Sequence, residues 1–479
     1  MSATASATDW ETVVGLEVHC ELATATKLFC GCRNAFGDEP NTNVCPVCLG
    51  LPGSLPVLNR GAVELAMRIG AALHSQVRRS SFHRKNYFYP DMPKDYQVSQ
   101  YDEPINVGGW LDLPDGTRVG VTRAHLEEDT GKTTHVGSSG RIHGADHALV
   151  DYNRAGVPLV EIVSEPDLRS AGDAQAYVNE LRALLVAIGA SDARMEEGSL
   201  RIDANISLRP TGTTTFGTRA EIKNLNSVRS LKRALEHEAA RQAGLLEAGE
   251  RIVQETRHWD EAAGRTSSMR SKEEAFDYRY FPEPDLVPVA PDDEWQAAVV
   301  GALAVLPAAR RAQLAAKAGV APADVALVVE RGLDHLVEAA IDAGADPRLA
   351  LARAANEVAS DLAAGLTLDP GAFTAVLAME AEGRLTATQA KQVLAELLAH
   401  GGDPSEIAAA RGFEALAGDT LALAVDAAVA AHPDEWGRLA GGEQKLVGFF
   451  VGKVMASTAG KADGRAVTAL LRERLGSGA

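Results

Sequence analysis

The sequence has few aromatic residues and an excess of negative charge. Only 5% of its 479 residues are aromatic, and 47 lysines and arginines stand against 65 aspartates and glutamates, a formal net charge of −18. This balance argues against a general nucleic-acid binder that relies on a bulk positive field, although it leaves room for a local basic surface. The sequence also lacks a long apolar run and the basic and apolar segments of a secretion signal. We therefore expect a soluble globular protein of the cytoplasm.

Cysteine is scarce as well, with five residues, but four of them form two close pairs. Cys30-x-Cys32 is followed by Cys45-Pro-Val-Cys48. Such cysteines can be small buried apolar side chains or disulfides, but two close pairs in a large chain without a secretion signal favour a structural zinc ribbon. A closed four-sulfur shell has no open position for substrate, so any catalytic site is expected elsewhere.

The composition changes near residue 281. All five cysteines and all eight tyrosines lie before Phe281, whereas the chain from Trp295 onward is dominated by Ala, Leu, Val, Glu and Arg. The Pro-rich run at 281–293 is typical of a connector between domains. A second break at 400–404 precedes further helical sequence. At 479 residues the chain is expected to hold two or three domains.

The periodicity differs on the two sides of this boundary. Before it, alternating polar and apolar residues predict strands at 13–22, 201–209 and 218–224, with Cys20 on an apolar strand face, and helical periods predict helices at 59–73, 170–188 and 227–246. After it, helices are predicted at 322–343, 347–364, 370–382 and 386–399. The predicted fold class is α+β, with a mixed or antiparallel sheet domain followed by all-α domains.

Charged residues recur in the predicted strands. Glu17, His19 and Glu21 share one face of the first strand, and similar sets occur at 125–129, 196–205 and 219–224. Each set could be a solvated surface, but carboxylates and neutral imidazole are also hard ligands suited to Mg²⁺. We predict one metal–nucleotide site whose catalytic residues are Glu17, His19, Glu127, Glu128, Asp203 and Glu221. All of these except Glu127 are predicted metal ligands, and Arg154, Lys223 and Arg279 are predicted to bind the nucleotide.

Two other patterns invite interpretation. The segment 129–133 imitates the end of a phosphate-binding loop, but Leu126 stands where that motif requires glycine. Aromatic residues are concentrated at 85–97 and 278–281, among Pro, Lys and Asp. These runs are typical either of a stacking or polynucleotide surface or of well-packed irregular loops.

Seven segments in this order resemble the B subunit of the aspartyl/glutamyl-tRNA(Asn/Gln) amidotransferases, the GatB family. They are Gly15-Leu-Glu-Val-His19, Cys45-Pro-Val-Cys-Leu-Gly-Leu-Pro-Gly53, Lys85-Asn-Tyr-Phe-Tyr-Pro-Asp-Met-Pro-Lys94, His125-Leu-Glu-Glu-Asp-Thr-Gly-Lys132, Asp151-Tyr-Asn-Arg-Ala-Gly-Val-Pro-Leu-Val-Glu-Ile-Val163, Glu221-Ile-Lys-Asn-Leu-Asn-Ser227 and Tyr278-Arg-Tyr-Phe-Pro-Glu-Pro-Asp-Leu286. Two further segments, 450–455 and 458–461, resemble the family's tRNA-contacting terminal domain.

The resemblance implies a catalytic cradle domain at 1–292 with its zinc ribbon at 30–48, a helical linker domain at 293–402 and a YqeY-like tRNA-binding tail at 403–479. It implies a carbon–nitrogen ligase with glutamine as amido-N donor. ATP would phosphorylate the side chain of Glu or Asp on misacylated tRNA(Gln) or tRNA(Asn), and ammonia would displace the phosphate. The implied cofactors are ATP, Mg²⁺ and structural Zn²⁺. The implied partners in a heterotrimer are the amidase (A) subunit, which supplies the ammonia, and the small C subunit.

Two other functions stay open on the residues alone. The chain could be a zinc-ribbon scaffold that docks tRNA while a partner performs all catalysis, and ATP consumption would distinguish this from the ligase. It could also be a free-standing metallohydrolase that uses His19 and the acidic residues, which a requirement for partner subunits would exclude.

Overall fold

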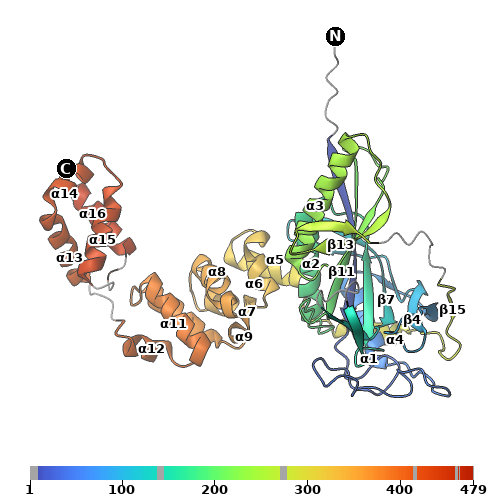
Figure 1. Ribbon diagram of the computed structural model, residues 1–479. Helices are drawn as coiled ribbons and strands as arrows, with labels where there is room; N and C mark the ends of the chain where they lie inside the picture. Colours follow the sequence, from blue (N-terminus) through green and yellow to red (C-terminus); the bar gives the residue numbers. More distant parts are fainter. Residues whose placement is uncertain are drawn as a thin grey trace, which may run out of the picture. The chain divides into compact units, whose positions relative to one another are not determined.

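The computed structural model describes residues 9–137, 145–269, 278–413, 418–458, 462 and 464–477. The chain divides into two compact units, Met1–Ala309 and Arg310–Ala479. The first unit combines a large sheet with helices, and the second is helical (Figure 1). This arrangement confirms the predicted α+β fold.

The first unit holds the strands and the first helices. Its strands are β1 (Trp10–Glu21), β2 (Gln76–Val77), β3 (Ser81–Asn86), β4 (Tyr96–Glu103), β5 (Asn106–Val107), β6 (Trp110–Asp112), β7 (Arg118–Glu128), β8 (Lys132–Gly137), β9 (Ala145–Asp151), β10 (Pro158–Ser164), β11 (Leu200–Pro210), β12 (Ala220–Lys223), β13 (Glu255–Asp260), β14 (Arg265–Ser268) and β15 (Phe281–Pro282). Its helices are α1 (Arg60–Ala72), α2 (Ala171–Ala187), α3 (Val228–Glu247) and α4 (Asp293–Gly301). The strands and helices predicted before residue 281 are all present.

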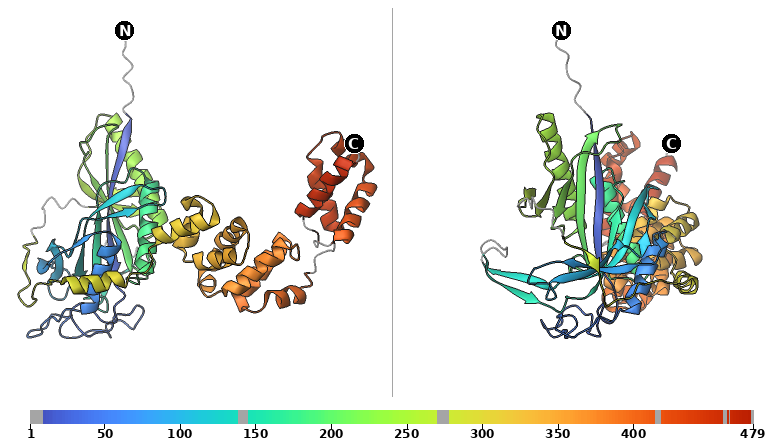
Figure 2. Two further views of the ribbon diagram at one scale, coloured as in Figure 1. Left: turned by 180° about the vertical axis from the view of Figure 1, so that it is seen from behind. Right: turned by 90° about the vertical axis from the view of Figure 1, so that its right-hand side faces the viewer.

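Thirteen of the described strands form one sheet, in which the central order is β14-β13-β12-β11-β1-β10-β7-β4-β3-β15. Strands β12 and β13 are parallel and the other pairs are antiparallel, so the sheet is mixed. Strands β8 and β9 make a separate two-stranded hairpin that extends away from the large sheet (Figure 2). Strand β1 lies at the centre, which explains why its polar side chains meet those of so many other strands.

The apolar face of the sheet is covered by helices α1, α2 and α3, whose buried residues join the strands in one hydrophobic cluster. Alternating burial along β1 places Leu16, Val18 and Cys20 in this cluster, as predicted for Cys20. Each helix begins at a polar cap, because the side chains of Asn59, Ser170 and Ser227 accept backbone N–H bonds of the first turn.

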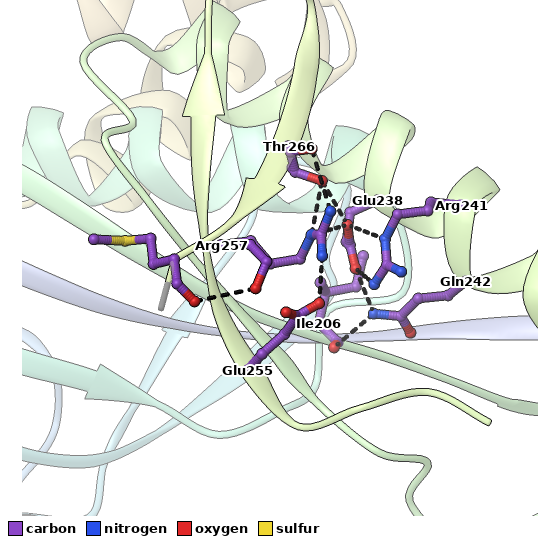
Figure 3. Close-up of polar contacts among 9 residues, drawn as sticks. Ile206, Glu238, Arg241, Gln242, Glu255, Arg257 and Thr266 are labelled. Carbon is purple, nitrogen blue, oxygen red and sulfur yellow. Dashed lines mark hydrogen bonds and ion pairs between the residues drawn. The ribbon is translucent and has the colours of Figure 1, made fainter. Parts of the chain in front are cut away.

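A buried ion network fastens helix α3 to the β13–β14 hairpin (Figure 3). Glu238 of α3 is fully buried and accepts hydrogen bonds from Arg241 at 2.6 and 2.9 Å and from the hydroxyl of Thr266 at 2.9 Å. Arg257 of β13 lies 3.2 Å from the same carboxylate and also pairs with Glu255. The network therefore fixes β13, whose alternate side chains point to the opposite face of the sheet.

The Pro-rich run is not the connector that the sequence predicts. Phe281–Pro282 pairs with β3, Val289 bridges to Ser80, and buried Glu283 binds Arg84 at 2.7 Å. Helix α4 then packs on α1, where the indole of Trp295 donates to Glu64 at 3.0 Å. The partners of this run lie far away in the sequence, so composition alone could not reveal them. The predicted domain boundaries at residues 292 and 402 stay predictions.

The second unit contains only helices among its described residues. They are α5 (Pro307–Ala318), which begins at the boundary, η1 (Pro322–Val325), α6 (Ala326–Glu330), α7 (Asp334–Asp342), α8 (Pro347–Asn356), η2 (Val358–Asp361), α9 (Leu362–Gly365), α10 (Pro370–Ala381), α11 (Ala387–His400), α12 (Pro404–Ala410), α13 (Gly418–Ala431), α14 (Pro433–Ala440), α15 (Leu446–Ser457) and α16 (Gly464–Ser477).

Two of the predicted helices are broken into shorter ones. The segment at 322–343 is interrupted at Gly332, whose φ of 70° is incompatible with a continuing right-handed helix, and 347–364 is interrupted after Asn356. The helices pack in two clusters, one from Leu314 to Ala408 and one from Leu421 to Leu471. Within the described chain no single helix is long and apolar enough to cross a membrane. Helix α5 and the segment Pro322–Glu330 reach the required length and hydropathy only when they are taken together, and the angle between them is 108°.

Candidate functional site

The face of the sheet opposite the helices is polar. His19 on β1 pairs with Glu161 on β10 and with Arg201 on β11, and Glu17 pairs with Asp203. Because side chains directly opposite in neighbouring strands point to the same face, this register gathers charges that lie far apart in the sequence. The predicted convergence of acidic residues from several strands is thus present for part of the predicted set.

Its centre is a histidine–carboxylate trio of His19, Glu127 and Glu161. The Nδ1 atom of His19 lies 3.5 Å from Oε1 of Glu127 and 4.0 Å from Oε2 of Glu161. One ligand atom from each residue lies within 4.8 Å of the others. One imidazole nitrogen and two carboxylates form a hard donor set, so these residues fit a divalent cation such as Mg²⁺.

The proton affinities in the trio reflect its crowding. Burial, together with the negative charge of Glu127, raises the pKa of Glu161 to about 7. Burial lowers the pKa of His19, but the hydrogen bond and charge of Glu127 outweigh this effect, and the pKa is raised overall. Burial likewise opposes ionisation of Glu127, yet contact with His19 lowers its pKa. A cation would relieve the repulsion between the two carboxylates, which a proton on His19 otherwise reduces.

Lys223 neutralises a second group of carboxylates on the same face. Its ammonium lies 2.8 Å from Asp203 and 2.9 Å from Glu221, and the hydroxyl of Thr256 donates to Glu221 at 2.7 Å. Burial opposes the charge on Lys223, but Asp203 and Glu221 raise its pKa. The predicted ligands Asp203 and Glu221 are therefore already paired with a cationic side chain, next to the trio rather than within it.

Two arginines gather around Asp129 at the other side of the trio. Arg201 binds Asp129 at 2.5 Å, and Arg154 lies 3.7 Å from it while donating to the carbonyl of Thr130 at 2.9 Å. Burial and the adjacent Asp129 raise the pKa of Glu21 to about 8, so this carboxyl is largely protonated at neutral pH. Asp129, by contrast, is held ionised because the two arginines outweigh its burial and lower its pKa.

These groups open into one cavity of about 1090 Å³. His19, Glu127, Glu161 and Asp203 line it, as do the carboxylates of Glu21 and Asp129. Five cationic side chains also line it: Lys85, Lys132, Arg154, Arg201 and Lys223. Asp38, Asp151, Glu196 and Glu197 line the cavity as well, so its acidic side chains outnumber its cationic ones. This lining fits a phosphorylated ligand that binds together with a divalent cation.

The structure does not bring Glu128 together with His19. Successive residues of a strand point to opposite faces, so Glu127 and Glu128 of β7 diverge. Oε1 of Glu128 accepts from Lys94 at 2.5 Å and from the backbone of Val98 at 2.9 Å. The prediction of Glu128 as a ligand of the same cation is corrected on this ground.

The remaining predicted residues have varied surroundings. Glu17 accepts a hydrogen bond from Asn205 at 3.0 Å and lines a neighbouring cavity of about 490 Å³. Arg154 and Lys223 line the main cavity, whereas Arg279 is not among its described lining residues, and nucleotide binding by these three residues stays a prediction. Glu21, Asp129, Glu161 and Arg201 were missed. The alternation of β1 places Glu21 on the same face as His19, so this residue could have been found from the sequence. The positions of the other three could be predicted only from the pairing of the strands.

The four paired cysteines converge, as predicted. Cys30, Cys32, Cys45 and Cys48 are free thiols whose sulfur atoms lie within 4.8 Å of one another, so they can bind a metal ion. Fully buried Lys27 lies nearby, and its ammonium has the carbonyl of Tyr152 as a hydrogen-bond acceptor at 3.1 Å. A dianionic zinc–tetrathiolate would compensate this buried positive charge, and the donor set therefore fits Zn²⁺.

The segment between the cysteine pairs, residues 33–44, forms one wall of the main cavity. Phe36 and Asp38 are among its lining residues. The segment is tied to the end of β9: the backbone N–H of Asn41 donates to Asp151 at 3.0 Å, and that of Asn43 donates to Asn153 at 2.8 Å. The cysteine cluster therefore holds both ends of a cavity wall.

Fold and site together define a class of protein: an α+β protein with a charged cavity on an open sheet, a four-cysteine cluster and a helical second unit. The GatB/GatE catalytic domain matches residues 12–297, and the GatB domain matches residues 335–475. The chain belongs to the GatB family.

Named relatives match almost the whole chain. A protein of Frankia casuarinae, named as the B subunit of aspartyl/glutamyl-tRNA(Asn/Gln) amidotransferase, is 54% identical over 484 residues, covering 98% of this chain and 96% of the relative. Proteins of the same name from Salinispora arenicola and Mycobacterium tuberculosis are each 51% identical, covering 98% of this chain and 97% and 95% of their own lengths.

Proposed function

We propose that this chain is the subunit of a tRNA-dependent amidotransferase that activates and amidates misacylated Glu-tRNA(Gln), Asp-tRNA(Asn) or both. One observation carries the proposal: the histidine–carboxylate trio opens into a cavity that lysine and arginine side chains also line, within the part of the chain that matches the catalytic domain of its family. The relatives' printed names supply the substrate and the reaction class.

The proposed reaction has two steps. A side-chain carboxylate oxygen of the esterified amino acid attacks the γ-phosphorus of ATP, and cleavage of the bond to the β-phosphate releases ADP. Ammonia then attacks the carbonyl carbon of the acyl phosphate, and the carbon–oxygen bond breaks to release phosphate and a proton. Phosphorylation is needed because an unactivated carboxylate would have to expel oxide.

The residues of the cavity have distinct roles in this scheme. Mg²⁺, when bound, would neutralise charge on the phosphate oxygens, and His19, Glu127 and Glu161 are the residues that would hold it. Lys223 and the two arginines beside Asp129 present positive charge to phosphate groups. Asp203 and Glu221 position Lys223, and the cysteine cluster, with Zn²⁺, supports the wall at 33–44.

Ammonia is proposed to come from a partner. We infer that an amidase, the A subunit, hydrolyses glutamine and that a small C subunit completes a cytoplasmic heterotrimer. The names of the relatives, which designate a B subunit, support a multi-subunit enzyme. The active preparation is therefore the complex rather than this chain alone.

The test is an ATP-dependent amidation assay with co-purified partners and either misacylated tRNA. Glu127→Gln removes one carboxylate of the trio with little change in volume, and it should lower the amidation rate by on the order of 10²-fold while leaving glutamine hydrolysis largely intact. Glu247→Gln changes an exposed carboxylate at the end of α3 and is the matched control. Equal loss of amidation and glutamine hydrolysis would contradict the assignment, and tRNA binding without ATP turnover in the wild type would favour a scaffold.

A further inference from the structure

The scarce tyrosines of this chain gather at the edge of the main cavity. Five of the eight form what we call the tyrosine rim: Tyr87, Tyr89, Tyr101, Tyr278 and Tyr280. Tyr87 and Tyr278 line the cavity together with Lys85. The two aromatic runs, for which the sequence left a stacking surface and packed loops as alternatives, thus border the same site.

Backbone contacts join the two runs into one surface. The backbone N–H of Asn86 donates to the carbonyl of Tyr278 at 3.1 Å, and its side chain donates to the carbonyls of Tyr278 and Arg279 at 2.8 and 3.0 Å. Arg84 and Glu283 add a bidentate ion pair with N–O distances of 2.7 and 2.8 Å. The rim is therefore fixed to β3 at the cavity edge.

The five rings contact one another in two groups. Tyr278 meets Tyr280 edge-on with centroids 6.0 Å apart, and Tyr280 stacks on Tyr101 at 5.5 Å with an interplanar angle of 20°. On the other side, Tyr87 stacks on Tyr89 at 4.8 Å. Tyr101 is 44% exposed and Tyr89 46% exposed, so the outer rings are not core residues.

Cations are interleaved with these rings. The ammonium of Lys85 lies 4.8 Å from the ring centre of Tyr278, and the guanidinium of Arg123 lies 4.6 Å from that of Tyr101. Exposed aromatic rings with adjacent cations are the combination that binds single-stranded nucleic acid, because every base can stack while the cations attract its backbone. Arg123 also lies 3.6 Å from Glu161, so this cation links the rim to the trio.

We propose that the tyrosine rim stacks the unpaired nucleobases at the 3′ end of the tRNA, next to the nucleotide that carries the amino acid. The inference rests on the proposed function and assigns a binding surface to its substrate. The adenine of ATP has the same stacking chemistry, but a nucleotide offers a single base. Tyr278, Tyr280 and Tyr101 are three successive rings, of which Tyr278 is among the lining residues of the cavity and the other two are not.

The experiment uses the co-purified complex and three measurements. They are the KM for misacylated tRNA, the Kd for ADP, and the fluorescence quenching of a single-stranded RNA oligonucleotide that contains 2-aminopurine. Tyr101→Ala should raise the KM by about 10-fold with kcat at saturating tRNA and the ADP affinity unchanged, and should weaken the quenching. Tyr101→Phe keeps the ring and should behave like the wild type.

Further variants keep the test decisive. Tyr89→Ala alters an exposed ring on a loop and serves if Tyr101→Ala does not fold, and Phe216→Ala removes a 59% exposed aromatic ring outside the rim as the control. An unchanged KM and unchanged quenching would overturn the proposal. Weaker ADP binding with an unchanged KM would also overturn it, because the rim would then bind the nucleotide. Loss of a co-purified partner chain would overturn it as well, because the rim would then belong to a protein interface. If the complex did not amidate misacylated tRNA but the quenching still depended on Tyr101, the proposed function would be refuted. The assignment of the tyrosine rim as a surface that stacks nucleobases would still be supported.

Discussion

At the scale of single residues, His125 shows how an ionisable group can be kept neutral beside a charged site. Its ring is fully buried, and both ring nitrogens are without a hydrogen-bond partner among the residues that the structure describes. The ring packs edge-on against Tyr101 with centroids 6.1 Å apart. Burial outweighs the attraction of Glu127 and lowers the pKa of His125 to about 4, so the imidazole is neutral at pH 7.

This shift predicts a pH dependence of stability. The unfolded chain binds a proton at His125 near pH 6.5 and the folded chain only near pH 4, so stability is greatest above pH 6.5 and is lost as the pH falls between these values. The single-site loss is about 3 kcal/mol. The measurement is the free energy of unfolding of the first unit, Met1–Ala309, for the wild type and for His125→Asn between pH 7 and pH 4. The difference between the two proteins should change over this range. A difference that is constant with pH would show that His125 titrates normally.

Single residues of the site also show which contacts could be predicted from the sequence and which could not. The alternation of β1 correctly placed Glu17 and His19 on one face, because a strand's own period is visible in its sequence. The same rule separates Glu127 from Glu128, yet the Mg²⁺ prediction counted Glu128 among the ligands and placed Glu127 beside them. Glu161 was overlooked because its closeness to His19 follows from strand pairing, which no local pattern contains.

At the scale of elements, the site depends on strands that pair across long stretches of sequence. Helices were predicted well where caps and breaks are local, as at Asn59, Ser170 and Ser227. Strand β15 was missed because its prolines suggest a connector and its partner β3 lies about 200 residues earlier. Short-range signals therefore predicted the kinds of element, and only the structure shows which strands are neighbours.

The network around Glu238 predicts a large stability effect from one element contact. Glu238→Gln leaves Arg241 and Arg257 without their shared carboxylate in a buried setting, and the free energy of unfolding should fall by about 3 kcal/mol. Denaturant unfolding followed by circular dichroism measures the change. Glu236→Gln, at an exposed position of the same helix, is the control and should change stability by less than about 0.5 kcal/mol. Equal stability of the two variants would mean that the network is energetically neutral.

The cysteine cluster predicts a metal that supports one wall of the cavity. The purified protein should contain about one zinc per chain, and Cys45→Ser should lower this content. Without the metal, the segment at 33–44 loses its anchor, so limited proteolysis there should become faster. Cys20→Ala is the matched control, because Cys20 belongs to the hydrophobic core and should leave the zinc content unchanged. Full zinc content in Cys45→Ser would contradict the assignment of this ligand.

At the scale of the whole molecule, three hydrophobic clusters are built from successive parts of the chain. The first belongs to the sheet unit, the second runs from Leu314 to Ala408, and the third runs from Leu421 to Leu471. Helix α12 starts one residue after the predicted start of the tail at 403, but its Ala408 packs in the second cluster. A truncation that preserves the second cluster must therefore keep α12 and end after Phe413.

This organisation predicts that tRNA affinity and nucleotide affinity can be separated. A chain that ends at Phe413 lacks only the third cluster, so the cavity on the sheet should keep its affinity for ADP. Affinity of the assembled complex for tRNA should fall by about 10-fold or more, as expected if several contacts in the tail each contribute modestly. Binding of labelled tRNA and of ADP by the full-length and truncated complexes measures both quantities. A shared loss would indicate a general folding defect, whereas unchanged tRNA affinity would mean that the helices from α13 onward do not contact the tRNA and that the sheet unit and the second cluster bind it alone.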